Sequence, residues 1–407
     1  MTETTLMSSS LKTAVSASTA SYISYWPIRL LFALEATSSA LILPRIPDIK
    51  HALALSDAEL GVALVGIPVG TLIGLIVAPV IVRKVGLKAG AMGAVVALAW
   101  AFALPGLTVS RLGLFGAFFV CGIAISHSEI ALNGLAGRLE AATGRRIMSQ
   151  CHGFWSLGMI AGTILGGTLA AWDVLLTRQS LIAAIVLTAG VLSLSRKLPR
   201  PTERITSGPS GHRPSLPSRR LLALCFLPVG IMVIEGIFMD WSAVHLRLTL
   251  GADPFGASLG FSAFAAAMAI TRLPGDALAA RFGEKVMVVI SCLAAGGGTL
   301  VFALGPTLAV ACAGAAVSGA GAAIVYPIAL SAAARLPGNP ARNIAAVSFT
   351  SFAVLLGSPA AFGFVAGSFG YATAISLCAI TALPGMFLTA GLAGPGGRNY
   401  GLGDTAQ

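Results

Sequence analysis

The sequence has few charged residues and none of the short motifs that would indicate a metal or nucleotide enzyme. Asp, Glu, Lys and Arg make up 10% of its 407 residues, against about 25% in an ordinary soluble domain. It contains neither an HExxH zinc motif nor a GxxxxGK[ST] phosphate loop, so neither a zinc protease nor a nucleotide-driven motor is indicated. We therefore predict no enzymatic activity, no cofactor and no metal.

The six cysteines do not form a CxxC pair or any spacing typical of metal ligands. All of them lie within or at the edge of apolar segments. We expect unreactive, buried thiols that pack as small apolar side chains.

Long apolar runs dominate the chain, with 56% hydrophobic residues and a mean hydropathy of +0.88. A helix needs about 20 apolar residues to cross the hydrocarbon core of a lipid bilayer. Twelve stretches approach this length: 26–45, 60–82, 89–107, 112–134, 148–171, 179–195, 221–243, 257–280, 286–304, 307–331, 343–367 and 371–393. The sequence therefore predicts an all-α membrane protein with twelve transmembrane helices.

A polar stretch divides these spans into two sets of six. Residues 196–220 carry seven Lys and Arg against the single Glu203, and their proline and glycine content is typical of a linker. We predict an N-terminal six-helix bundle over 26–195, this linker, and a C-terminal six-helix bundle over 221–393. Residues 1–25 are expected to form a disordered N-terminal tail, and residues 394–407 a C-terminal tail.

The basic residues predict the orientation in the membrane. If the linker is cytoplasmic, 19 of the 26 Lys and Arg fall in cytoplasmic segments, five lie outside, and Arg29 and Arg272 lie within spans. This bias follows the positive-inside rule, so both termini are predicted in the cytoplasm of a cell (inner or plasma) membrane protein. The net charge of +11 is spread over short loops, so we expect no nucleic-acid partner. Nothing in the sequence requires more than a monomer.

Internal repetition indicates that the two halves have the same topology. Lys84-x-Gly86-x-Lys88 follows the second predicted span, and Arg281-x-Gly283-x-Lys285 follows the eighth, at an offset of 197 residues. Glu35 in the first span and Glu235 in the seventh are 200 residues apart. Two pseudo-symmetric bundles are therefore predicted.

These features resemble the major facilitator superfamily over essentially the whole chain. The resemblance is narrower to its MosC-like branch, named for a proposed rhizopine permease. It rests on these pieces: Glu129-Ile-Ala-Leu-Asn133, Glu140, Gly144-Arg145, Met148-Ser149, His152-Gly153, Trp155-Ser156-Leu157-Gly158, Arg45-Ile-Pro47, Ser56-Asp57-Ala-Glu-Leu-Gly61, Glu235-Gly236, Asp240-Trp241-Ser242-Ala243, Gly275-Asp276 and Arg281-Phe-Gly283. It implies the major facilitator fold, with a small-molecule substrate bound midway between the bundles.

Carboxylates within the spans are the first candidates for function, because an ionisable group at membrane depth usually marks a solute or proton pathway. Glu129 and Asn133 share a helix face with Ser126 and could bind a polyol, an amine or a proton. The alternative for Glu129 is a hydrogen bond that holds helices together. Sugar–proton symporters resembling fucose permease place carboxylates on spans one and four, which pairs Glu35 with Glu129. The rival for Glu35 is a structural ion network with Arg29.

His152 and Trp155 are candidates on the fifth span. A histidine titrates near neutrality, and an indole can stack on a sugar ring or an amine. A packing role for His152 is the alternative.

The second half carries further candidates on spans seven and eight. Glu235 could line the cavity, whereas Asp240, five residues later, is predicted to serve a gate near the external end or to pair with Arg247. Arg272 and Asp276, four apart, could form a gating latch near the cytoplasm.

The predicted function is secondary active transport by alternating access. We expect proton-coupled symport of a small polar solute, sugar-like or amino-sugar-like. The alternative is a proton-driven exporter of amphipathic compounds on the same fold. A polytopic membrane enzyme is disfavoured because no nucleophile–base pair or metal cluster is evident.

Overall fold

The computed structural model describes residues 25–143, 145, 147–198, 218–337 and 339–392, and every regular element in these ranges is a helix. The first half contains α2 (Trp26–Ala40), η1 (Leu43–Arg45), α3 (Ile46–Ala52), α4 (Asp57–Leu64), α5 (Gly66–Val85), α6 (Leu87–Ala101), η2 (Leu104–Leu107), α7 (Arg111–Thr143), α8 (Met148–Ala171) and α9 (Leu176–Leu194).

The second half contains α10 (Arg219–Phe226), α11 (Val229–Leu250), α12 (Pro254–Phe282), α13 (Glu284–Leu304), α14 (Leu308–Ala322), α15 (Val325–Arg335), α16 (Pro340–Val354), α17 (Ser358–Phe369), α18 (Tyr371–Ile380), α19 (Leu383–Phe387) and η3 (Leu388–Leu392).

These helices form membrane-spanning segments. Eleven of the described helical segments are long and apolar enough to cross a bilayer, and the shorter apolar segment Tyr371–Phe387 follows them. Helices suit this setting because they satisfy their backbone hydrogen bonds internally. The predicted all-α multi-pass membrane fold is confirmed.

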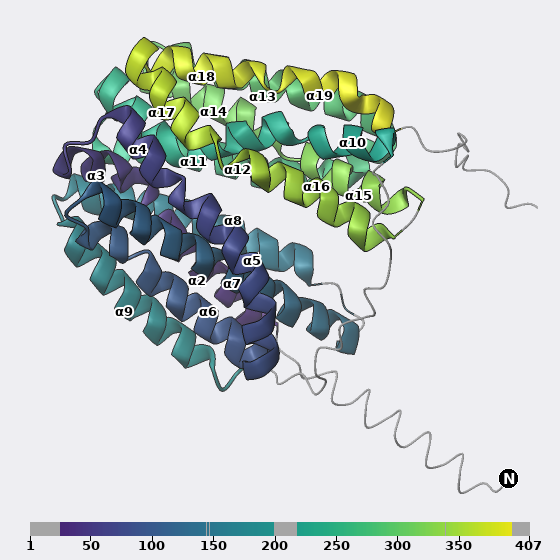
Figure 1. Ribbon diagram of the computed structural model, residues 1–407, viewed down its shortest axis with the longest axis horizontal. Helices are drawn as coiled ribbons and strands as arrows, with labels where there is room; N and C mark the ends of the chain where they lie inside the picture. The colour runs from purple at the N-terminus through teal and green to yellow at the C-terminus, as the bar shows by residue number, and fades with distance from the viewer. Residues whose placement is uncertain (1–24, 144, 146, 199–217, 338, 393–407) are drawn as a thin grey trace, which may run out of the picture.

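The chain forms two bundles that follow its two halves (Figure 1). Helices α2–α9, coloured purple to teal, make the N-terminal bundle, and α10–α19, coloured teal to yellow, make the C-terminal bundle. Residues 1–24 of the predicted N-terminal tail, the whole predicted C-terminal tail at 394–407, and residues 199–217 of the predicted linker lie outside the described residues.

We name the two ends of the bundles after Arg45 and after the linker between the halves. The Arg45 end holds α3, the start of α4 and the end of α11, and the linker end holds the end of α9 and the start of α10. At the Arg45 end, α4 packs on α17, and α11 contacts α3 and η1. There a Cβ on Gly61 would lie 2.4 Å from the carbonyl oxygen of Pro359. The bundles therefore meet backbone to backbone at this end.

The repeated Gly86 and Gly283 adopt the same unusual backbone. Gly86 has φ 85° and ψ 155°, and Gly283 has φ 86° and ψ 141°. Each residue ends one helix and precedes the next, α6 in one half and α13 in the other. A side chain is strained at such positive φ angles, so the repeated glycine marks an equivalent turn in both halves.

Small residues hold α5 and α7 close together. A Cβ on Gly70 would lie 2.0 Å from the carbonyl oxygen of Phe119, and one on Gly122 would lie 2.0 Å from that of Ile67. In a bilayer, such close packing replaces the hydrophobic drive that lipid does not supply.

We expect Gly122→Ala to destabilise the protein by about 1–3 kcal/mol, because the added methyl group overpacks the contact with α5. Gly116→Ala is the matched control on α7, since its Cβ would meet nothing within 4 Å. Thermal unfolding in detergent measures both changes. Equal midpoints for the two variants would contradict the close helix contact.

Candidate functional site

A cavity of about 240 Å³ lies between the two bundles. Its walls come from α2 to α8 of the first bundle and from α11, α16 and α17 of the second. The lining residues are Glu35, Ser39, Ile42, Leu43, Ile46, Leu64, Ile67, Pro68, Thr71, Leu72, Phe102, Phe118, Ile125, Glu129, Trp155, Met159, Gly236, Met239, Asp240, Phe352, Leu355, Ser358 and Pro359. The cavity therefore lies where a major facilitator fold would bind its solute.

Glu35 on α2 is held by donors from two other helices. Its side chain is buried, with the residue 7% exposed. Ser128 Oγ of α7 donates to Oε1 at 3.0 Å, and Trp155 Nε1 of α8 donates to Oε2 at 2.7 Å. The predicted rival partner, Arg29, instead donates to the side-chain oxygen of Gln150. The carboxylate is thus oriented by neutral donors that fix α2, α7 and α8 relative to one another.

Glu129 also lines the cavity, but its surroundings differ from those of Glu35. It is exposed, and the described residues give its side chain no hydrogen bond or ion pair. Asn133, one turn further along α7, is half-buried and does not line the cavity. Ser126 turns away from the cavity and donates to the carbonyl oxygen of Thr71 at 2.7 Å. The predicted polar face therefore presents mainly its carboxylate to the solute space.

The two candidates on α8 have separate surroundings. Trp155 lines the cavity and holds Glu35. His152 is exposed and does not line it, and its ring packs edge-on against Phe32 with centroids 5.5 Å apart. The structure therefore brings Trp155, rather than His152, to the solute space.

Of the two acids on α11, one lines the cavity and the other does not, as helix geometry requires. Asp240 lines the cavity together with Gly236 and Met239, whereas Glu235 does not. Five residues turn a helix by about 140°, and α11 is unbroken between the two acids. Asp240 thus lies in the cavity wall, and its predicted role in a gate stays a prediction.

Arg272, on α12, does not line the cavity. It is exposed, and its Nε donates to the carbonyl oxygen of Ala323 at 3.2 Å. The side chain of Asp276 lies outside the described residues, so the pair with Arg272 stays a prediction.

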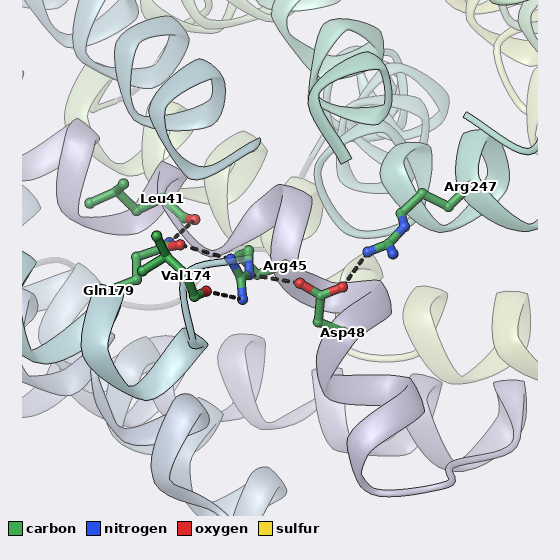
Figure 2. Close-up of polar contacts among 6 residues, drawn as sticks. All are labelled: Leu41, Arg45, Asp48, Val174, Gln179 and Arg247. Atoms are coloured by element: carbon green, nitrogen blue, oxygen red, sulfur yellow. Dashed lines mark hydrogen bonds and ion pairs between the residues drawn. The ribbon is translucent and has the colours of Figure 1, made fainter. Parts of the chain in front are cut away.

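An ion-pair network joins the bundles at the Arg45 end (Figure 2). Arg45 Nε lies 2.7 Å from Asp48 Oδ2, and Arg247 of the second bundle binds the other oxygen of Asp48. The Arg45 guanidinium also donates to Gln179 Oε1 at 3.2 Å and to the carbonyl oxygen of Val174 at 3.0 Å. Asp48 therefore carries the contact between bundles, and Arg45 anchors Asp48 to the first bundle.

A second polar contact between the bundles lies close to this network. Lys50 Nζ is 3.2 Å from Asp57 Oδ1, and the hydroxyl of Tyr371 in the second bundle donates to the same carboxylate. Asp48, Asp57 and Tyr371 were not predicted to be functional. The sequence offered one signal for the two acids: Asp48 and Asp57 lie near Arg45 and Lys50, in a region with few other basic residues.

These contacts close the bundles against each other at the Arg45 end. Toward the linker end, His152 on α8 and Arg272 on α12 are exposed. The described residues hold no group of three or more His, Cys, Asp or Glu that could bind a metal ion. The arrangement can therefore admit a solute from one end and hold it against carboxylates, without a metal centre in the described part of the chain.

Known proteins with similar sequences are transporters and membrane proteins. No protein-family model matches the chain. An uncharacterized MFS-type transporter of Yersinia pestis is 32% identical over 351 residues, which cover 83% of this chain and 88% of the relative. Membrane protein MosC of Rhizobium meliloti is 27% identical over 354 residues, 85% of this chain and 83% of MosC. The resemblance to the MosC-like branch is confirmed.

The fold has a close match among solved structures. The nucleoside transporter NupG, solved as its D323A mutant, superposes with a TM-score of 0.73 at 13% identity and covers 90% of this chain and 99% of NupG. At this identity the match concerns the fold alone. Together with the sequence relatives, it shows that the chain belongs to the major facilitator superfamily of membrane transporters.

Proposed function

We propose that this transporter moves a small organic solute by alternating access and couples the movement to protons. One observation carries the proposal: the carboxylates of Glu35, Glu129 and Asp240, from three helices and both bundles, line a single cavity. Carboxylates at membrane depth are costly and are retained mainly in solute paths and proton relays. A cavity between two rocking bundles provides such a path.

The two acids of the first bundle have different proposed roles. Glu35 already accepts hydrogen bonds from Ser128 and Trp155, so it is suited to orient a solute. Glu129 is exposed and has no protein partner among the described residues, so it is suited to take up and release a proton. Asn133, His152 and Glu235 would tune these groups from outside the lining.

The sorting of basic residues supports an orientation with the linker end in the cytoplasm. In that orientation, the contacts of Asp48 with Arg247 and of Asp57 with Tyr371 form the closed outer gate. Outward opening would break both contacts. Arg272 and Asp276 remain our candidates for the latch that forms at the cytoplasmic side.

The solute class has two candidates. The sequence favours a polar, sugar-like or amino-sugar-like solute taken up by symport. The cavity wall favours the alternative, proton-driven export of amphipathic compounds, because most of its lining side chains are apolar, including Phe102, Phe118 and Met159. Apolar walls with a few placed polar groups are typical of sites for amphipathic small molecules.

Glu129→Gln tests the proton role. We expect at least about a tenfold loss of solute-driven proton flux, because a titrating side chain that carries protons contributes roughly this much or more. The measurement uses proteoliposomes that contain a pH-sensitive dye, with glucosamine, inositol and trimethyl(2-phenylethyl)ammonium as solutes. Glu59→Gln is the control, since Glu59 lies outside the cavity and pairs with Arg111 at 2.7 Å. Unchanged proton flux and pH dependence in Glu129→Gln would remove Glu129 from this role.

Trp155→Phe tests the positioning of Glu35. The substitution keeps an aromatic ring but removes the donor at 2.7 Å from Glu35. A hydrogen bond to a charged group contributes about 1.5–3 kcal/mol, so we expect solute exchange to fall about tenfold or more while the protein stays folded. Trp172→Phe, at an indole that is 72% exposed, should exchange solute at the original rate. Similar rates in both variants would mean that the indole donor is dispensable.

Asp48→Asn tests the outer gate. Losing the charge weakens the contact with Arg247, so the Arg45 end should open more often. We expect several-fold faster labelling of Leu43→Cys, a buried cavity position, by an impermeant thiol reagent applied from the outer side of a cysteine-free background. Glu59→Gln removes an ion pair within one bundle and should leave the labelling rate unchanged. A rate in Asp48→Asn equal to that of the control argues against the gate.

A further inference from the structure

The charged side chains that line the cavity all have the same sign. They are Glu35, Glu129 and Asp240, and among the described residues the lining includes no Lys, Arg or His. Three acids in one small space repel one another and are poorly solvated by apolar walls. A solute that carries a positive charge would relieve this cost, whereas an anion would increase it.

Two of the three acids have no hydrogen-bonding or ionic partner among the described residues. Glu35 accepts hydrogen bonds from Ser128 and Trp155. Glu129 and Asp240, from opposite bundles, make no hydrogen bond or ion pair with any described residue. They are therefore the groups that a cationic head would contact, and such a contact would bridge the two bundles.

In the described structure, the basic side chains of Arg29, Arg247 and Arg272 bind groups outside the cavity lining. Arg29 donates to Gln150, Arg247 binds Asp48, and Arg272 donates to the carbonyl oxygen of Ala323. Arg272 does not line the cavity. The positive charge that matches the cavity must therefore come from the solute or from protons.

The remaining wall suits an apolar body better than a polyol. Besides the acids and Trp155, the polar lining side chains are Ser39, Thr71 and Ser358, and the Ser39 hydroxyl already donates to the carbonyl oxygen of Ala36 at 3.1 Å. A polyol would leave many hydroxyl groups unpaired, which costs about 1–3 kcal/mol for each buried group. The rings of Trp155, Phe102 and Phe118 can instead contact an apolar body and attract a cation.

We infer that the solute of this cavity is a monovalent organic cation with an apolar body, whose charged head is held between Glu129 of α7 and Asp240 of α11. The inference rests on the proposed function, since it concerns the same cavity. It goes beyond that proposal by naming the charge and the shape of the solute and the two acids that select it.

The first experiment measures binding by calorimetry with the full-length protein in detergent at pH 7. The probes are 2-phenylethylamine, 2-phenylethanol and phenylacetate, which share one apolar body and differ in head charge. Glucosamine supplies an amine on a polar body. We expect 2-phenylethylamine to bind at least about tenfold more tightly than the other three, as a buried ion pair can contribute. Equal affinities for the amine and the alcohol, or tighter binding of glucosamine, would overturn the inference.

Substitutions at Glu129 and Asp240 test whether these two acids select the charge of the solute. Glu129→Gln and Asp240→Asn should each weaken 2-phenylethylamine binding about fivefold or more, the loss expected when one partner of a buried pair is neutralised. Binding of 2-phenylethanol should change little, which also shows that the cavity is intact. Glu59→Gln should bind all probes as the original protein does. An equal loss for the amine and the alcohol would mean that the two acids act on folding and not on charge selection.

Counterflow of trimethyl(2-phenylethyl)ammonium in proteoliposomes then separates the inference from the proposed function. This cation cannot lose its charge, so it crosses lipid poorly without a carrier. Charge-selective binding without counterflow would sustain the selectivity but refute transport through the cavity. Counterflow of glucosamine or inositol without that of the cation would sustain transport and refute the cationic solute.

Discussion

A carboxylate buried at membrane depth needs hydrogen-bond donors, water or a proton, and this need organises the centre of the transporter. Glu35 meets it with Ser128 and Trp155, so one acid fixes the relative positions of α2, α7 and α8. Glu129 has no such donors among the described residues and is instead exposed in the cavity, where water or a proton can reach it. The same requirement therefore yields a hydrogen-bonded acid and an accessible acid within one bundle.

The membrane also explains how the bundles are built and joined. Lipid tails solvate leucine as well as a neighbouring helix does, so helices associate by close packing and polar contacts. Gly70 and Gly122 allow α5 and α7 to meet at the backbone. Between bundles, polar contacts at Asp48 and Asp57 act at one end. Such contacts can be broken and reformed without unfolding either bundle, which alternating access requires.

Within the candidate site, the residue type indicated which side chains to examine but not which of them line the cavity. Glu35 and Glu129 line the cavity, and so does Asp240, which was predicted for a gate, whereas Glu235, which was predicted to line it, does not. Asn133 and His152 lie on the expected helices but outside the lining. Their placement depends on the rotation of α7 and α8, which neighbouring helices set. Asp48 and Tyr371 were not predicted to be functional because their partners are some two or three hundred residues away.

Local composition was enough to reveal the helical spans, the repeated glycine turn and the excess of basic residues on one side. Each of these follows from the cost of placing polar groups in lipid, which acts on every segment separately. Long-range packing decided the rest: which acid finds donors, which acid lines the cavity, and which ion pairs join the bundles. Those outcomes depend on helix rotation and on contacts between distant segments. Periodicity along a single chain does not encode them, because every face of a buried membrane helix can be apolar.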